Sequence, residues 1–169
     1  TRNSGAIWFL TSEDEWYKAA WHKAPGSFGV RYGFGRDSLT DADANFLHSG
    51  DTADDGTTPV GFFNGVNVLS DGETPTADTD NGYGLYDLCG NVAEWVHDLD
   101  RTGPTPLGAT RGGHFNHPID FTPLRTDVRE VLPADAALAF VGFRVAQSLT
   151  PMPLTITLDD GATNGDVTA

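Results

Sequence analysis

The residues best suited to chemistry lie in one short segment, NGYGLYDLCGNVAEW, at positions 81–95. Asp87 and Glu94 supply carboxylates on either side of Gly90, where a tight turn would let backbone carbonyls face inward. Calcium takes roughly six to eight oxygen ligands and mixes carboxylates with backbone and amide carbonyls. The segment can therefore offer a calcium site, although acidic residues are also ordinary turn formers and helix caps. The EF-hand spacing is absent from the sequence.

The same segment holds Cys89, which is the only cysteine of the chain. A single cysteine excludes an intramolecular disulfide, so any cross-link that stabilises the fold must be of another kind, such as a metal ion. Cys89 itself is expected to act as a small buried hydrophobic residue.

Two histidines form a second candidate site. His114 and His117 are three residues apart, and histidine is a common ligand of transition metals. The sequence offers no third ligand at a convincing spacing, so a surface or hydrogen-bonding role is favoured. The chain has neither a Ser-His-Asp arrangement nor a P-loop.

Composition limits the classes of partner. The 169-residue chain has a formal net charge of −14, which opposes binding to nucleic acid and to anionic membranes. No apolar run is long enough for membrane insertion. The excess of carboxylates suits cation binding, and it suits an ordinary solvated acidic surface equally well. Twenty glycines and ten prolines predict a loop-rich domain with little regular helix.

Few regular elements are expected to position these residues. Ser12 and Glu15 form a capping box that predicts a helix ending at Pro25 and Gly26, with Trp16 as a core anchor. Residues 26–80 predict loops, and a loop region of that length needs an external tie such as an ion. The remaining expected elements are a buried strand at 6–10, a strand or short helical turn at 92–97, and strands at 110–115, 139–146 and 154–158.

Four phrases occur in a fixed order: FLTSEDEWYKAA, NGYGLYDLCGNVAEWVHD, RGGHF and GFRVA. Together they resemble the signature of the formylglycine-generating-enzyme, or sulfatase-modifying-factor, family, over about residues 6–147. The resemblance implies an α+β, C-type-lectin-like fold that is rich in ordered loops. It predicts a domain at 1–147 from which the N-terminal part of the family's domain is absent. Residues 148–169 are expected to be a linker and a strand, the possible start of another module.

The resemblance also implies one or two calcium ions. The first would use the Asp87 side chain, the carbonyls of Gly90 and Val92, and Glu94. The second would use ligands from the acidic loop, namely the Asn45 side chain, the Phe46 carbonyl, Asp55 and the Thr57 carbonyl.

Formylglycine-generating oxidase activity is not expected. In the family this reaction needs two cysteines five residues apart, and the matching positions here are Phe121 and Thr126. Neither side chain can supply the thiolate that copper(I) prefers. Relatives of the sulfoxide-synthase type take their iron ligands from a helical bundle that this sequence does not contain.

These observations predict a non-catalytic, calcium-stabilised binding or structural module that presents residues 114–130. Its partner would be a protein, a glycan or further copies of itself, and calcium supply favours an extracellular or periplasmic location. Arg111 and Arg144 are expected to pair internally with acids of the helix or of the GNVAEW turn. The alternative is part of an enzyme whose catalytic groups lie on a missing segment or a partner chain. The predicted partner-contacting residues are His114, Phe115, Asn116, His117, Arg125 and Arg129.

Overall fold

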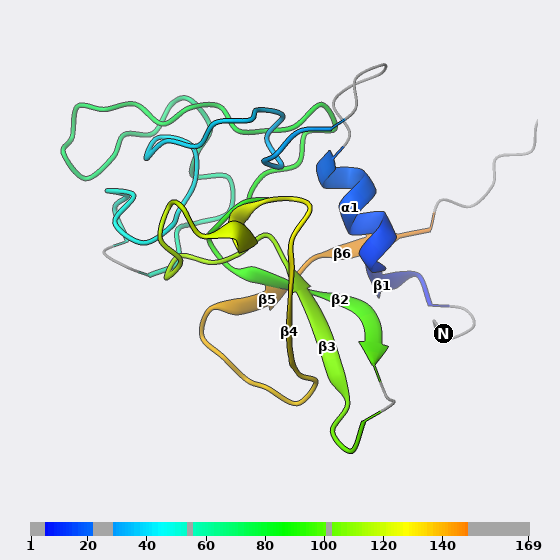
Figure 1. Ribbon diagram of the computed structural model, residues 1–169. Helices are drawn as coiled ribbons and strands as arrows, with labels where there is room; N and C mark the ends of the chain where they lie inside the picture. Colours follow the sequence, from blue (N-terminus) through cyan, green and yellow to red (C-terminus); the bar gives the residue numbers. More distant parts are fainter. Residues whose placement is uncertain (1–5, 22–28, 54–55, 101–102, 149–169) are drawn as a thin grey trace, which may run out of the picture.

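The computed structural model describes residues 6–21, 29–53, 56–100 and 103–148 of the chain (Figure 1). Regular structure is confined to both ends of this region, and the long middle part consists of loops. In chain order the elements are β1 (Trp8–Leu10), α1 (Glu13–Trp21), β2 (Ala93–Asp100), β3 (Leu107–Arg111), the 3-10 helix η1 (Thr122–Leu124), β4 (Arg129–Pro133), β5 (Val141–Phe143) and β6 (Val145–Gln147).

The strands form two small sheets. The larger sheet has the order β4-β3-β2-β5, in which β2 runs antiparallel to β3 and parallel to β5. The smaller sheet pairs β1 with β6 in antiparallel orientation. In the larger sheet Glu94 of β2 lies opposite Arg111 of β3 and Gly142 of β5. This mixture of one helix, short strands and loops confirms the expected loop-rich α+β class.

The capping box at the start of α1 is confirmed. The Ser12 backbone N–H donates to Glu15 Oε2 at 2.8 Å, and the Glu15 N–H donates to Ser12 Oγ at 3.2 Å. A third partner comes from β2, where Asp98 Oδ2 accepts the Glu13 N–H at 2.5 Å. Trp16 is buried, which confirms it as a core anchor. The expected helix end at residues 25 and 26 lies outside the described residues.

Two expected strands differ from those observed. The strand expected at 6–10 exists as β1, but it is not a buried strand, since Trp8 is 61% exposed. It belongs to a two-stranded sheet, and no other described segment covers the face that carries Trp8. The strand expected at 110–115 ends at Arg111, because Gly112 and Gly113 adopt φ values of 89° and 68° that break the extended backbone.

The other two strand predictions are refined. The segment expected at 92–97 is a strand rather than a helical turn; the strand begins at Ala93 and continues to Asp100. Residues 139–146 do not form one strand, because the chain passes from the larger sheet to the smaller one at Arg144. The strand expected at 154–158 lies outside the described residues, as does all of 148–169 except Ser148.

Two hydrophobic clusters support this arrangement. One joins α1 to the larger sheet through Trp16, Ala20, Leu88, Val96 and Ala109. The other fills the loop region and consists of Tyr32, Phe34, Ala44, Phe46, Cys89 and Leu124. Burial of Cys89 confirms its expected role as a small hydrophobic residue and raises the pKa of its thiol. Within the described part of the chain, no helix has the length and apolar character needed to cross a membrane.

Candidate functional site

Segment 81–95 turns sharply, and the turn brings the two expected calcium-ligand sets together. Asp87, Gly90 and Asn91 all have positive φ, of 58°, 73° and 62°. A Cβ added at Gly90 would lie 2.1 Å from the Asn45 carbonyl oxygen, so only glycine fits there. The Asn91 N–H then donates to the same Asn45 carbonyl at 2.7 Å. The two ligand sets are therefore neighbours that share the backbone contact at Gly90.

Glu94 is hydrogen-bonded through its carboxylate to two side chains of the protein. Its carboxylate is buried, with 5% of the residue exposed, and it accepts three hydrogen bonds. Arg144 donates from Nη2 to Oε1 at 2.7 Å and from Nε to Oε2 at 3.0 Å. Trp16 Nε1 donates to Oε2 at 2.6 Å. This bidentate pair confirms the prediction that Arg144 pairs with an acid of the GNVAEW turn.

Arg144 also reaches the backbone of the same segment. Its Nη2 donates to the Tyr86 carbonyl at 2.8 Å and lies 3.5 Å from the Asp87 carbonyl. The Asp87 side chain accepts the Gly61 N–H at 2.8 Å, and burial raises the pKa of that carboxyl. Because a guanidinium already neutralises Glu94, the first ligand set does not fit a calcium ion in this arrangement.

The second ligand set is different. Asn45 is 1% exposed, and its Nδ2 donates to the Gly56 carbonyl at 2.8 Å, which fixes the orientation of the amide. Its Oδ1 is buried without a hydrogen-bond partner. An unsatisfied buried oxygen costs about 1–3 kcal/mol, and a hard cation would satisfy it. Of the other predicted ligands, Thr57 is exposed, and Asp55 lies outside the described residues. Within the described part of this set, Asn45 Oδ1 is an unsatisfied oxygen of the kind that calcium binds, whereas the Phe46 carbonyl accepts the Ser49 N–H at 3.0 Å.

The predicted recognition segment is partly buried. His114 and His117 are 7% and 8% exposed, so their rings support the surface rather than form it. The rings stack in a row from Phe121 through His117 and His114 to Phe140, with centroid distances of 4.5, 3.5 and 4.1 Å. Burial lowers the pKa of both histidines to about 4, so they are neutral at pH 7. Between the two histidines in sequence, Asn116 is exposed and Phe115 is half-buried.

The structure adds a third group to the histidines that spacing did not reveal. Glu130 arrives from β4, and its Oε1 lies 3.7 Å from His117 Nε2. Ligand atoms of the three residues lie within 4.8 Å of one another. However, His114 Nδ1 accepts the Asn116 N–H at 3.1 Å, and His117 Nδ1 accepts the His114 N–H at 3.3 Å. Neutral rings bonded in this way carry their proton on Nε2, so metal binding through that atom would have to displace the proton and break the hydrogen bond to Nδ1. The cluster is a hydrogen-bonded support.

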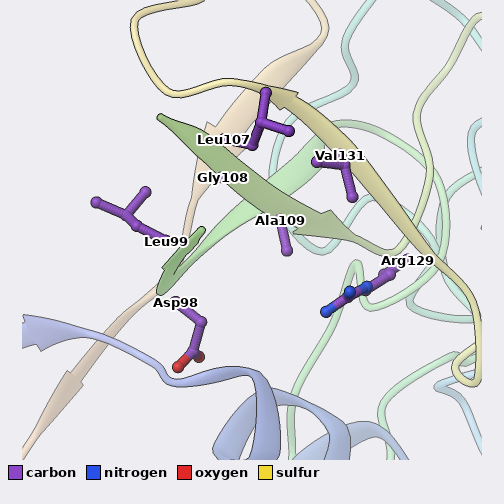
Figure 2. Close-up of a pocket in the computed structure, with 7 residues that line it drawn as sticks. All are labelled: Asp98, Leu99, Leu107, Gly108, Ala109, Arg129 and Val131. Carbon is purple, nitrogen blue, oxygen red and sulfur yellow. The ribbon is translucent and has the colours of Figure 1, made fainter. Parts of the chain in front are cut away.

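A surface cavity of about 240 Å³ lies between the larger sheet and the start of α1 (Figure 2). Leu99, Leu107 and Val131 form apolar walls, and Asp98 and Arg129 provide its charged groups. No sequence pattern predicted this cavity, because its residues come from three strands. Arg129 is thus a predicted contact residue that lines this cavity.

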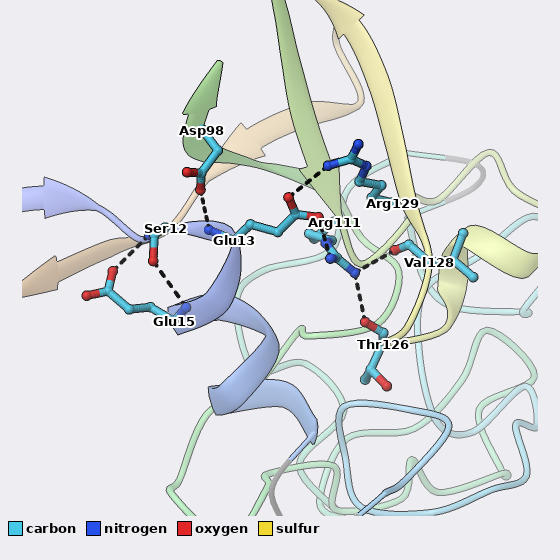
Figure 3. Close-up of polar contacts among 8 residues, drawn as sticks. All are labelled: Ser12, Glu13, Glu15, Asp98, Arg111, Thr126, Val128 and Arg129. Atoms are coloured by element: carbon cyan, nitrogen blue, oxygen red, sulfur yellow. Dashed lines mark hydrogen bonds and ion pairs between the residues drawn. The ribbon is translucent and has the colours of Figure 1, made fainter. Parts of the chain in front are cut away.

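Two arginines, Arg111 at the end of β3 and Arg129 at the start of β4, are held by one acid of α1 (Figure 3). Arg111 is buried and bonds Glu13, which confirms its predicted pairing with an acid of the helix. It also donates to the carbonyls of Thr126 and Val128 at 3.0 and 3.2 Å. Arg129 bonds the other Glu13 oxygen at 3.0 Å. One acid of α1 therefore anchors both the start of β4 and the segment before it.

The two positions that would carry catalytic cysteines have ordinary structural roles. Thr126 is fully buried, and its hydroxyl donates to the Val30 carbonyl at 2.8 Å. Phe121 is 42% exposed at the end of the ring stack. Neither position offers a ligand for copper, so the residues confirm that the thiolate pair is missing.

Comparison with known proteins agrees with this geometry. The model of the FGE-sulfatase family, described as "Sulfatase-modifying factor enzyme 1-like domain", matches residues 1–149 of this chain. Among solved structures, CarF is 24% identical with a TM-score of 0.61, over 88% of this chain and 50% of CarF. PvdO from Pseudomonas aeruginosa is 25% identical with a TM-score of 0.57, over 84% of this chain and 53% of PvdO.

Treponema denticola variable protein 1 is 23% identical with a TM-score of 0.50, over 83% of this chain and 47% of that protein. None of the curated proteins gives a significant match. The chain spans about half the length of the solved structures that it matches. Because the family match extends over nearly the whole chain, the chain belongs to the sulfatase-modifying-factor family and has its loop-rich, C-type-lectin-like fold.

Proposed function

We propose that this chain is a non-catalytic binding or structural module, stabilised by a calcium ion held by Asn45, the Phe46 carbonyl, Asp55 and the Thr57 carbonyl. The observation that carries the proposal is the buried Asn45 Oδ1, which has no hydrogen-bond partner. The proposal does not include the oxidase reaction of the family, because Phe121 and Thr126 stand at the positions of the two cysteines which that reaction needs.

An ion at Asn45 would support the recognition segment through the backbone. The Asn91 N–H donates to the Asn45 carbonyl, and the Phe115 N–H donates to the Asn91 carbonyl at 3.0 Å. From the other side, the Leu47 N–H donates to the His117 carbonyl at 2.8 Å. Fixing Asn45 therefore fixes both ends of residues 115–117, and the ion acts as a brace for the surface that follows.

The surface itself is formed by exposed residues beyond the histidines. Ile119 and Phe121 are each 42% exposed, and Arg129 lies at the cavity of Figure 2. Exposed apolar side chains such as these, and a separate surface cavity, are both typical of contact surfaces for a protein, a glycan or a second copy. The net charge of −14 disfavours nucleic acid as the partner.

Chelation tests the ion. With calcium at a hundredfold excess over its Kd, the bound ion should stabilise the fold by about 2.7 kcal/mol. We expect EDTA to lower the melting temperature of the wild type and to leave Asn45→Ala unchanged. The matched control is Asn116→Ala, an exposed asparagine that should respond to EDTA as the wild type does. An unchanged wild-type melting temperature would contradict the calcium proposal.

A paired substitution tests the surface. We expect Ile119→Ser combined with Phe121→Ser to abolish whichever association is seen, whether oligomers by light scattering or binding on a glycan array. Val60, at 86% exposure, lies in another loop, so Val60→Ser serves as the control and should retain the association. Association that persists in the double variant would place the contact elsewhere.

The proposed location is extracellular or periplasmic, since millimolar calcium outside the cytosol keeps a moderate-affinity site filled. Fractionation of cells that express the natural gene tests this directly. Recovery of the protein only in the cytosol would contradict it.

One observation favours the alternative, an enzyme completed by other residues: the chain covers about half of each solved relative. In that case a protein extended to the length of the relatives should consume oxygen with a thiol or sulfide substrate. The chain described here should not, because in this alternative the catalytic groups lie on residues outside it.

A further inference from the structure

Two expectations compete for the same carboxylate. The family resemblance assigns Glu94 to a calcium ion, whereas Arg144 of the GFR phrase is expected to pair with an acid of the helix or of the GNVAEW turn. The structure shows the second arrangement, with both carboxylate oxygens bonded to the guanidinium. A second donor, Trp16 Nε1, approaches Oε2 from α1.

We infer that the Arg144 guanidinium takes the place of a metal ion in segment 81–95, so that the chain binds at most one calcium ion. The inference rests on the proposed function only for that single ion, in the Asn45 set.

The guanidinium bonds the kind of oxygens that calcium would need. It takes both Glu94 oxygens and the Tyr86 carbonyl, and it approaches the Asp87 carbonyl. A planar guanidinium fits a carboxylate with two parallel bonds, and its remaining N–H groups reach carbonyls in the same plane. Arg144 thereby ties three positions of the loop to the strand junction between β5 and β6.

Charge explains why the ion and the arginine exclude each other. Glu94 carries one negative charge, which the guanidinium balances at 2.7 Å. A divalent ion added at the same carboxylate would face that positive charge in a site where only 23% of the Arg144 side chain is exposed. The other predicted carboxylate, Asp87, is bonded through Oδ2 to the Gly61 N–H. The Asn45 Oδ1 has no such competitor among the described residues.

Calorimetric titration with calcium chloride tests the count of ions. We expect one ion per chain for the wild type and for Glu94→Gln, with Kd values within about twofold of each other. Asn45→Ala should bind none. Two ions in the wild type, one of which disappears in Glu94→Gln, would overturn the inference.

A second measurement covers the case in which Glu94→Gln does not fold. In the wild type, NMR should show a slowly exchanging Arg144 Nε–H signal, assigned by its disappearance in Arg144→Lys. Saturating calcium should leave its shift and exchange rate unchanged, because the ion binds elsewhere. A calcium-induced loss of that signal would overturn the inference. A wild type that binds no ion and keeps the signal would refute the calcium function and uphold the role of Arg144.

Discussion

The two sides of Gly90 are held in opposite ways. On one side, Glu94 is buried and accepts three hydrogen bonds from Arg144 and Trp16. On the other side, Asn45 is just as buried, yet its Oδ1 has no partner. The first side has its partners within the protein, and the second has a buried oxygen without one, where we propose that a cation binds. By our inference, the residues of both calcium-ligand sets are present in the sequence, but the Arg144 guanidinium takes the place of the ion in one of them.

The largest expected effect comes from breaking the complete side. Arg144→Ala would leave the Glu94 carboxylate buried and unpaired, which costs about 3–5 kcal/mol. We expect this loss in the free energy of unfolding, measured by urea denaturation. Combining it with Glu94→Gln should recover part of the loss, because the buried charge is then removed as well. Equal stability of Arg144→Ala and the wild type would show that the pair does not form.

The contact between the two sides can be broken at Gly90. A Cβ there would meet the Asn45 carbonyl oxygen at 2.1 Å, whereas Gly84 has nearly the same φ, 72° against 73°, and open space around it. Both alanine variants carry the backbone strain of positive φ, about 1 kcal/mol. We expect Gly90→Ala to cost at least about 2 kcal/mol more than Gly84→Ala, measured by denaturation, and to weaken calcium binding as well. Equal costs would mean that the close approach to Asn45 is absent.

The recognition segment should respond to acid. Because burial lowers the pKa of His117 to about 4, the folded state takes up this proton at a lower pH than the unfolded state does. The stability from the neutral ring is present above about pH 6.5 and is lost as the pH falls toward 4. We expect a loss of about 1–2 kcal/mol per histidine between pH 7 and pH 5.

His117→Phe should reduce this pH dependence while it preserves the stack on Phe121. Burial raises the pKa of Glu94, Asp87 and Glu130, which acts in the opposite direction, so the informative quantity is the difference between variant and wild type. The free energy of unfolding at both pH values measures it. Identical pH profiles would indicate that His117 is not buried as described.

The smallest effect is expected for an exposed pair. Arg125 bonds Asp127 at 3.0 and 2.6 Å, and both side chains are about one-third exposed. Exposed ion pairs contribute about 0–1 kcal/mol. Arg125→Ala should therefore change stability by less than about 1 kcal/mol, far less than Arg144→Ala. A comparable loss in both variants would remove the contrast between buried and exposed pairs.

Local signals predicted the elements that depend on neighbours in sequence. The capping box of Ser12 and Glu15 identified the helix start, and the glycines predicted the loops. The pairing of Arg111 and Arg144 with acids was also predictable, because the chain has only ten basic residues against 24 acids and both arginines lie in the family phrases. The exposure of Trp8 and the burial of the histidines were not, since both depend on which segment covers a face.

The sequence by itself determined the family, the loop-rich α+β class, the missing thiolate pair and the two sets of oxygen-bearing residues, because each of these is a matter of residue type and spacing. Only the tertiary structure decided which carboxylate keeps a charge partner. Arg144 is 50 residues from Glu94 along the chain, and β5 brings them together beside β2. Whether an oxygen is free to bind a cation depends on its neighbours in space, and those neighbours follow from strand order.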